Sequence, residues 1–514
     1  MASARRLERL RVAPYGFALA AALVLLSSTH TASAQERERP RRESGKGERG
    51  AERESRQAGP LRALEDAEEE HAPTVFAHDG WPLAGYHGNR FYLRDEHGRF
   101  QFFPGGVLQV DGRGTFAKGA SDVPGNRAAS LQPRLDVRRA RLTLAGTVHD
   151  RIGWLITADM GRSPQFGSTL VDAEIHRWLH VAVGLQPLAF GMENRSNMAW
   201  RSWMERTLTG RFSVTDRLET GALLWGEGRR RVVAYEVGVS SGEGRNHAES
   251  DGRFDYSARV TARPLAPTGG IASKIQIGFS GRFGVRRSLR DTQDVGSLTT
   301  DGGWTFFSAN RSDRDGRSLR ILTSGQQKAV GGEVRVPVSR LDLRFEFVAL
   351  EKETRETEAG KETVASERFG TYTGSAFYGQ VGVWLLGSSA LGQPDPGVFR
   401  AARPLRFPRG DRHVAPHGLE ALARVENLSL TYRSNDRGRR AAEAASTEKV
   451  RATVLGFGLR YWATMHANFF ASYTLTHLPD SGSPDNAAVS PGNSIGLKSA
   501  HNVHEVGWRA QMAF

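Results

Sequence analysis

The sequence predicts an all-β protein, a transmembrane antiparallel β-barrel with an even number of strands near sixteen, preceded by a signal peptide and a charged disordered tether. Three observations lead to this fold class. The chain begins with an export signal, residues 85–514 consist largely of short alternating segments, and the last segment is alternating and aromatic.

The N-terminus has the three parts of a secretory signal. Four arginines lie between positions 5 and 11, Tyr15–Leu26 is an almost unbroken apolar run, and Ala32-Ser33-Ala34 offers small residues for cleavage before Gln35. We therefore expect residues 1–34 to be a cleaved signal peptide. The alternative is an uncleaved anchor, but the apolar run is too short to span a bilayer comfortably.

The composition favours a barrel over a helical membrane protein. The chain has no cysteine and 58 glycines, only 39% of its residues are hydrophobic, and its mean hydropathy is −0.45. In a barrel only alternate residues meet lipid, whereas the lumen and loops are polar. A soluble, β-rich secreted protein would have a similar composition.

The charge is strongly positive, at +14. The signal carries four arginines and one glutamate, and residues 35–72 carry nine basic and eleven acidic side chains, so the part from Pro73 onward holds +13. A basic chain often binds nucleic acid, but an export signal argues against that partner. Small anions are the partners that we expect.

Residues 35–87 are predicted to form a charged, low-complexity periplasmic tether. Residues 35–72 are almost entirely Glu, Arg, Gly, Ser and Ala, and such a segment cannot bury enough apolar surface to offset its ordering entropy. A short helical or coiled-coil stretch around Leu61 to Glu70 is the alternative. The barrel itself is expected over residues 88–514.

The barrel region alternates with a period of two. In one such segment, Ile152, Trp154 and Ile156 lie on one face of the expected strand, and Leu155 and Thr157 lie on the other. The more apolar face of each strand is expected to point outward. A β-sandwich has the same period but rarely continues it over so long a unit. Four longer polar stretches are predicted to be extracellular loops: Arg286 to Gln327, Lys352 to Glu367, Gly392 to His417 and Asn435 to Lys449.

The C-terminal segment repeats this alternation with aromatic residues. Val506, Trp508, Met512 and Phe514 share one parity, and Arg509 has the other. This is typical of the closing strand of an outer-membrane barrel. We expect Trp508, Met512 and Phe514 to form the signal for the barrel-assembly machinery, and Arg509 to point into the lumen.

Several segments, in this order, resemble the phosphate-selective porin O and P family over about residues 88–514. They are Phe103-Pro104-Gly105-Gly106 through Asp111, Val137-Arg138-Arg139-Ala140-Arg141-Leu142, Val183-Gly184-Leu185-Gln186-Pro187 and Leu455-Gly456-Phe457-Gly458-Leu459-Arg460-Tyr461. The resemblance implies a homotrimer of sixteen-stranded barrels in the outer membrane of a Gram-negative bacterium. It also implies that one loop folds into each lumen as a constriction.

The stretch Pro187 to Arg211 is the candidate for that loop, because it is long and rich in arginine. Guanidinium groups stay charged and bind phosphate oxygens in a fork. Arginines whose parity opposes their apolar neighbours should face the lumen, since an Arg on the lipid side costs about 2–4 kcal/mol at the midplane. The candidate anion-binding residues are Arg139, Arg141, Arg195, Arg201, Arg206, Arg211, Arg424 and Arg460. The alternative for each arginine is a structural pair with Asp159, Glu174 or Glu205.

These features predict an outer-membrane channel for passive diffusion of phosphate, polyphosphate or other small anions. The alternatives are a less selective porin and a non-conducting barrel that acts as a surface anchor or adhesin. An enzyme is not expected: the histidines are scattered, and His501 and His504 differ in strand parity, so they do not form a metal site. We predict no catalytic residue, metal or cofactor. The expected partners are small anions, outer-membrane lipid, the barrel-assembly machinery and two further copies of the chain, and not nucleic acid.

Overall fold

The computed structural model describes residues 80–88, 90–117, 133–161, 164–214, 217–245, 252–270, 272–286, 294–312, 318–358, 368–388, 397–405, 417–437, 446–479 and 501–514. The predicted signal peptide and residues 35–79 of the predicted tether lie outside these ranges. Among the described residues, no helix has the length and apolar character needed to cross a membrane.

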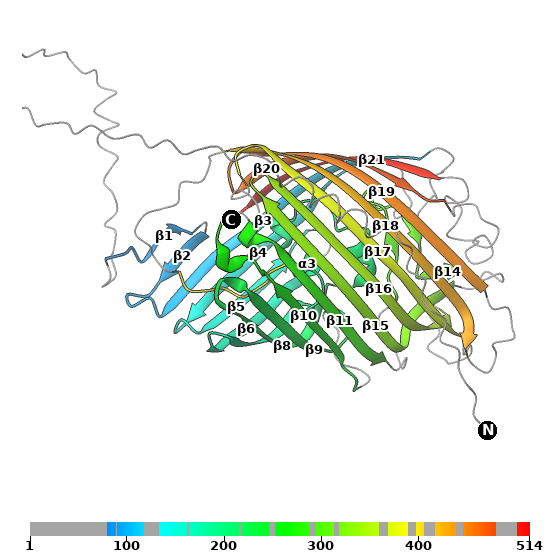
Figure 1. Cartoon of the computed structure of the whole chain (residues 1–514), viewed down its shortest axis with the longest axis horizontal. Coiled ribbons are helices and arrows are strands. Elements are labelled where there is room, and N and C mark those ends of the chain that lie inside the picture. Colours follow the sequence, from blue (N-terminus) through cyan, green and yellow to red (C-terminus); the bar gives the residue numbers. More distant parts are fainter. Residues whose placement is uncertain are drawn as a thin grey trace, which may run out of the picture. The chain divides into compact units, whose positions relative to one another are not determined.

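Sixteen strands in the described part of the chain form one closed antiparallel sheet, as the sequence predicts (Figure 1). The sheet closes because the last strand pairs with the first, with Arg509 opposite Asp111. The strands are β3 (Phe100–Ala117), β4 (Arg134–Val148), β5 (Ile152–Asp159), β6 (Gln165–His176), β7 (Leu179–Pro187), β8 (Leu218–Glu227), β9 (Val233–Ser240), β10 (Asp255–Ala262), β11 (Gln276–Arg286), β15 (Ser318–Val338), β16 (Leu341–Glu358), β17 (Arg368–Leu386), β18 (Gly418–Arg437), β19 (Ser446–Trp462), β20 (Ala467–His477) and β21 (Asn502–Ala513).

The remaining elements are short. A hairpin of β1 (Ala84–His87) and β2 (Arg90–Arg94) pairs with the start of β3. The others are β12 (Leu298–Thr299), β13 (Thr305–Phe307), β14 (Asn310–Ser312), α3 (Met192–Arg195), η3 (Met198–Trp200), α4 (Leu208–Ser213), η4 (Arg229–Arg231), η5 (Ala266–Thr268) and η6 (Ala272–Lys274).

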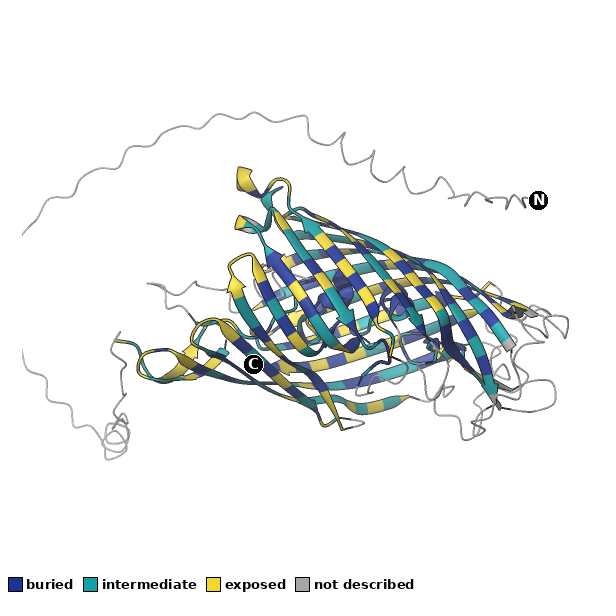
Figure 2. Cartoon of the chain, turned by 90° about the horizontal axis from the view of Figure 1, so that it is seen from below, coloured by how far each residue is buried: buried dark blue, intermediate teal, exposed yellow. Residues whose placement is uncertain are grey.

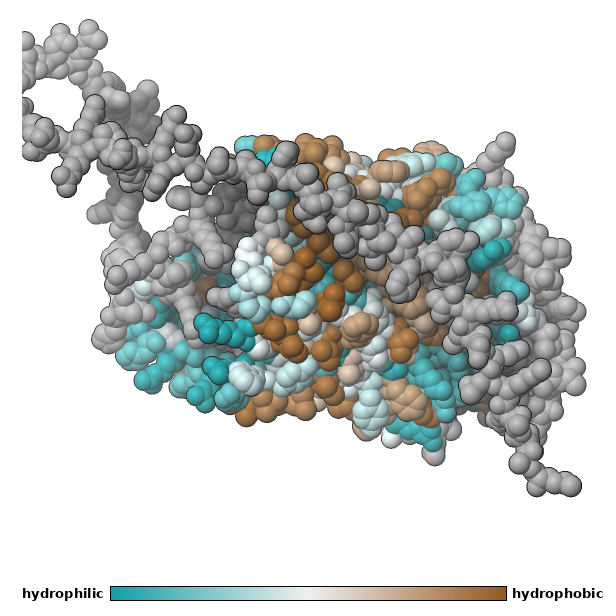
Figure 3. Space-filling model, in the orientation of Figure 1, coloured by the Kyte–Doolittle hydropathy of each residue, from teal (hydrophilic) through white to brown (hydrophobic). Residues whose placement is uncertain are grey.

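Side chains alternate between the two faces of the barrel wall, and Figure 2 shows this as bands of exposed and buried residues along each strand. In β5, Ile152 and Ile156 are exposed whereas Thr157 and Asp159 are buried. The exposed hydrophobic residues form a belt between hydrophilic ends in the view of Figure 3. An apolar outer belt with a polar inner face suits a wall between lipid and a lumen. The predicted alternation is therefore confirmed.

The two ends of the barrel differ in the length of their connections. At one end the turns are tight, such as Ser339-Arg340 between β15 and β16, where Ser339 takes a φ of 52°. We call this the short-turn end, which is periplasmic in barrels of this kind. Three of the four predicted extracellular stretches include a connection at the opposite, long-loop end.

The prediction for Gly392 to His417 was wrong. This stretch joins β17 to β18 at the short-turn end, because Trp384 near the end of β17 donates to the carbonyl of Arg340 in the β15–β16 turn at 2.8 Å. A long polar segment indicates a loop, but its end of the barrel depends on the direction of the preceding strand. That direction requires a correct strand count.

Part of the barrel interior is filled by apolar packing. Residues 188–214, here called the inward segment, and the β12–β13 hairpin pack against the inner face of β15–β19. Phe212 and Tyr372 bring their ring centroids within 5.9 Å, and Phe307 and Tyr372 within 5.6 Å.

Candidate functional site

The inward segment lies inside the barrel, at the place that the sequence predicts for a constriction loop. Ser280 on β11 accepts a hydrogen bond from the Gly191 amide at 3.0 Å, and Gln511 on β21 donates to the Ala199 carbonyl at 2.7 Å. These strands lie on different sides of the closed sheet. The segment therefore extends across the bore.

Carboxylates hold the helical turns of this segment. Glu346 on β16 accepts from the Glu193 amide at 3.1 Å, in the first turn of α3. Glu426 on β18 accepts from the Leu208 amide at the start of α4, where Thr207 also caps the helix. Such contacts satisfy amides that lack an intrahelical partner.

A ring of arginines on the wall holds the tip of the inward segment through Glu205. Arg138 donates from Nε to Glu205 at 3.1 Å, and Arg113 and Arg509 also contact this carboxylate. Burial raises the pKa of Glu205, but the charges of Arg138, Arg113 and Arg509 outweigh it and hold the pKa well below its usual range. Glu205 is therefore ionised and serves as an internal anion for these arginines.

Arg138 reaches the lumen because β4 contains a bulge. Gln109 of β3 lies opposite Arg139, whereas the next residue, Val110, lies opposite Val137. The extra residue is Arg138, and a bulge lets it face the same side as Arg139. Strict alternation does not predict this, so the sequence argument missed Arg138; the adjacent arginine pair was the only available signal.

Five arginines lie together on the side of the inward segment that faces β4, and we call them the arginine cluster: Arg139, Arg141, Arg201, Arg206 and Arg217. Burial, followed by the positive charges of Arg201, Arg206 and Arg141, lowers the pKa of Arg217 well below its usual range. Arg139 in turn has Arg201 among its charged neighbours. Four of the five are predicted residues, whereas Arg217 was missed because it follows the predicted loop.

The arginine cluster has few compensating carboxylates. Arg141 pairs with Asp159 at 3.1 Å, but Arg139 donates to the neutral Gln109 side chain at 2.6 Å. Arg201 has a carboxylate oxygen of Glu193 at 4.0 Å from its Nε, beyond hydrogen-bond distance. Its Nε and Nη2 are buried without a hydrogen-bond partner among the described residues. Buried guanidinium groups of this kind favour a bound anion.

Two other predicted arginines are neutralised by one loop carboxylate. Asp301, between β12 and β13, accepts from Arg211 at 3.0 Å and from Arg424 at 2.6 Å. Arg424 also pairs with Glu426 at 2.7 Å. These arginines fasten the β12–β13 hairpin to α4 and to β18, so they form structural pairs, but with carboxylates other than the three that the sequence suggested.

The last two predicted arginines hold the inward segment through backbone carbonyls. Arg195 is fully buried; it donates to the Pro187 carbonyl at 2.6 Å and to Glu236 at 3.0 Å. Arg460 on β19 faces inward as its parity predicts, and it donates to the Ser202 carbonyl at 2.8 Å. Both hold the segment in place, and Arg195 is also a charged neighbour of Arg217 in the arginine cluster.

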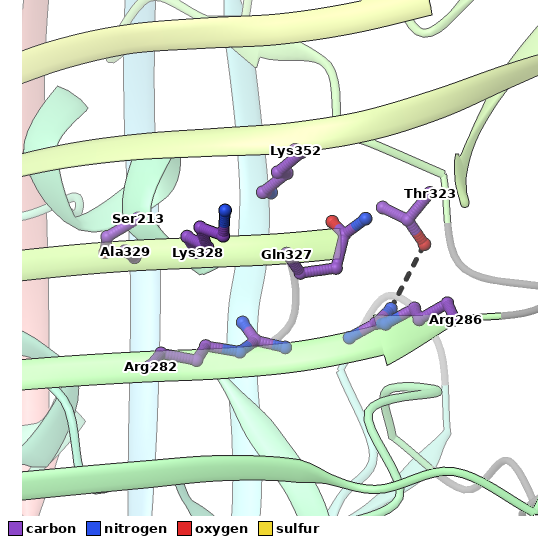
Figure 4. A pocket seen from close by; sticks show the side chains of 8 residues that line it. All are labelled: Ser213, Arg282, Arg286, Thr323, Gln327, Lys328, Ala329 and Lys352. Atoms are coloured by element: carbon purple, nitrogen blue, oxygen red, sulfur yellow. Dashed lines mark hydrogen bonds between the residues drawn. The ribbon is translucent and has the colours of Figure 1, made fainter. Parts of the chain in front are cut away.

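A second basic pocket lies between α4 and the wall formed by β11, β15 and β16 (Figure 4). Arg282 and Arg286 both donate to Asp255, at 2.9 Å from Arg282 Nε and 2.7 Å from Arg286. Arg286 also donates to the Thr323 hydroxyl at 3.1 Å, and Lys352 lines the opposite side. The shared carboxylate makes this pocket less positive than the arginine cluster.

Within the described ranges, no group of three or more His, Asp or Glu side chains is arranged to hold a metal ion. At the barrel seam, Trp508 stacks on Phe469 with 6.0 Å between ring centroids, and the Phe514 amide donates to the Gly106 carbonyl at 3.1 Å.

Similar solved structures are outer-membrane proteins of low sequence identity. Expressed OmpT of Vibrio cholerae has a TM-score of 0.45 and 10% identity, covering 81% of this chain and 98% of its own. An anion-selective porin from Comamonas acidovorans has a TM-score of 0.43 and 8% identity, with coverages of 81% and 100%. The outer membrane channel DcaP of Acinetobacter baumannii has a TM-score of 0.43 and 11% identity, with coverages of 82% and 99%.

No curated protein matches the sequence. The assignment therefore rests on the sequence model of one family, which matches residues 111–499, together with the closed barrel described above. The chain belongs to the phosphate-selective porin O and P family and is an outer-membrane porin.

Proposed function

We propose that the barrel is an anion-selective diffusion channel for phosphate or other small oxyanions, with the arginine cluster as its selective point. The observation that carries this proposal is the concentration of five guanidinium groups beside a segment that crosses the bore, where Arg139 donates to the neutral Gln109 side chain and two nitrogens of Arg201 are buried without a hydrogen-bond partner in the described residues. The low-dielectric wall strengthens the electric field of these arginines, and this positive field repels cations.

The same arrangement suits conduction as well as binding. An ion must leave as readily as it enters, which favours several moderate sites over one tight cage. Arg139 is held by the neutral Gln109 side chain and Arg217 by backbone carbonyls, so their positive charge remains available to a passing anion. Forked guanidinium groups favour oxyanions over spherical halides. The phosphate class is therefore the substrate class that we propose.

We also propose a homotrimer in outer-membrane lipid, inserted by the barrel-assembly machinery after export by the N-terminal signal. The exposed apolar belt supports contact with lipid and with neighbouring copies. The family and the fold are those of a channel, and we propose no catalytic role, metal or cofactor.

The experiment that tests this function is planar-bilayer recording of the purified barrel. In a gradient of potassium chloride we expect the reversal potential to have the sign of the chloride equilibrium potential, which shows that chloride permeates better than potassium. Added phosphate should reduce the chloride current, because it occupies the arginine cluster. Conduction without phosphate competition would indicate a less selective porin. No conduction would indicate a surface anchor and would overturn the proposal.

A further inference from the structure

Residues 397–405, here called the strap, cross the short-turn end of the barrel. In sequence the strap lies between β17 and β18, yet its contacts are on the opposite wall. The Leu405 amide donates to Gln101 on β3 at 2.7 Å, and Arg403 donates to Glu227 on β8 at 2.7 Å. A Cβ placed on Gly153 of β5 would lie 2.3 Å from the Ala402 carbonyl oxygen, so the strap rests directly on that strand.

The strap is also bonded to the inward segment. The Gly397 amide donates to the Ser196 hydroxyl at 2.8 Å, and Arg195 donates to the Phe399 carbonyl at 2.9 Å. Gly397 has a φ of +80°, and its Cβ position would lie 3.1 Å from Met192. Only glycine accommodates both this backbone and this close approach without strain.

One carboxylate joins the strap, the inward segment and the wall. Glu236 on β9 accepts from Arg195 at 3.0 Å, from Arg400 of the strap at 2.6 Å and from Arg259 of β10 at 3.4 Å. All three are charge-assisted hydrogen bonds in a site where Glu236 is only 3% exposed. Removing this carboxylate would leave three buried guanidinium groups without their shared partner.

The arginine cluster is in contact with the same assembly. Arg217 donates from Nε to the Asn194 carbonyl at 2.6 Å, and its guanidinium group lies 5.9 Å from the centroid of the Phe399 ring. The guanidinium group of Arg195 lies 5.7 Å from the centroid of the same ring. The ring of Phe399 therefore supports one arginine of the cluster and one that anchors the segment.

We propose that the strap determines selectivity from a distance: it holds the inward segment in place through Glu236, which is the positioning residue of the arginine cluster. This inference rests on the proposed anion channel. Loosening the strap widens the short-turn mouth and lets the inward segment shift. Conductance then rises while anion selectivity falls, because the guanidinium groups no longer converge on one path.

The chain offers a matched control in Glu333. This carboxylate on β15 accepts from Arg259 at 3.0 and 2.6 Å and from Gln276 at 3.2 Å, all of them wall residues. Glu236→Gln and Glu333→Gln therefore remove the same charge from the same network. If only the lost negative charge matters, both variants become more anion-selective. If Glu236 positions the arginine cluster, Glu236→Gln becomes less anion-selective and Glu333→Gln does not. The two explanations therefore predict changes of opposite sign in the permeability ratio of Glu236→Gln.

The experiment is reversal-potential and single-channel recording of the full-length protein in a potassium chloride gradient, with inorganic phosphate as the competitor. We expect Glu236→Gln to show higher conductance, a several-fold lower anion-to-cation permeability ratio and weaker phosphate block. Glu333→Gln should keep the wild-type values or become more anion-selective. Equal shifts of both variants toward anions would overturn the inference.

A second pair keeps the test open if Glu236→Gln fails to assemble, as judged by heat-modifiable migration on gels. Arg400→Gln and Arg403→Gln remove the same charge from the strap, but Arg403 pairs with Glu227 away from the inward segment and is 52% exposed. The permeability ratio should fall several-fold more in Arg400→Gln. Equal effects would overturn the positioning role, whereas a wild-type channel without anion preference would instead overturn the proposed function.

Discussion

Arg509 forms a two-pronged ion pair with Asp111 across the seam where the last barrel strand meets the first. Its Nε and Nη2 donate to the two carboxylate oxygens at 2.6 and 2.7 Å, and Nη1 donates to the Met204 carbonyl at 2.6 Å. One guanidinium group therefore closes the sheet and holds the inward segment. The closure of the barrel and the position of the constriction are thus linked.

The first prediction concerns this pair. Replacing Asp111 with Asn should lower the free energy of unfolding by about 3–5 kcal/mol, because it leaves a buried guanidinium group without its main counter-charge. Equilibrium urea unfolding in detergent micelles measures the change. Asp159→Asn is the control, since Arg141 has one hydrogen bond to Asp159 and is more exposed. Equal stabilities of the two variants would contradict the importance of the seam.

The second prediction concerns the arginine cluster. Replacing Arg201 and Arg206 together with Glu should reverse the ion selectivity, since it changes the local charge by four units beside the bore. The reversal potential in a salt gradient measures this. Arg177 and Arg340 are exposed at the short-turn end, so their double replacement by Glu makes the same charge change outside the lumen. Unchanged anion preference in the first variant would remove that segment from the conduction path.

The third prediction concerns pH. The folded-state pKa of Glu205 lies below its unfolded value. This carboxylate therefore stabilises the fold at any pH above its unfolded pKa, and the stabilisation is lost only as the pH falls through the lowered, folded-state pKa. The contribution of Glu205 to selectivity and stability, measured as the difference between the wild type and Glu205→Gln, should therefore stay constant between about pH 5 and 8. Reversal potentials and urea midpoints across that range measure this. A transition near neutral pH that disappears in Glu205→Gln would contradict the ionised state assigned to Glu205.

The fourth prediction concerns assembly. Deleting Phe514 should impair insertion into the outer membrane and leave export intact, because it removes the backbone pairing with Gly106 and the aromatic contact with Phe91, at 6.1 Å between centroids. Membrane fractionation and heat-modifiable migration measure the outcome. Val506→Ala, which trims an outward side chain of the same strand outside the predicted signal and keeps the backbone pairs, is the control. Normal assembly without Phe514 would count against its role in the assembly signal.

Much of the fold could be predicted because alternation is a local property. The inward position of Arg460 and Arg509 follows from the parity of their neighbours, and the closed all-β architecture follows from many such segments. A bulge interrupts parity, and for that reason Arg138 was missed. The end of the barrel at which Gly392 to His417 lies was also wrong, since it depends on a complete strand count.

The roles of individual arginines could not be predicted from the sequence. Arg195 and Arg201 lie six positions apart in one segment, yet one is bound to Glu236 and two carbonyls whereas the other lacks partners at two of its nitrogens. The difference arises from residues such as Glu236 and Phe399, which are distant in sequence. Long-range contacts of this kind leave no spacing that a single sequence reveals.

The reversal potential of the wild-type channel, measured in a potassium chloride gradient before and after addition of inorganic phosphate, tests the central claim most directly. The arginine cluster predicts a potential of the sign set by chloride and a chloride current that falls as phosphate is added. A potential of the sign set by potassium, or a chloride current insensitive to phosphate, would contradict the claim that these arginines select oxyanions.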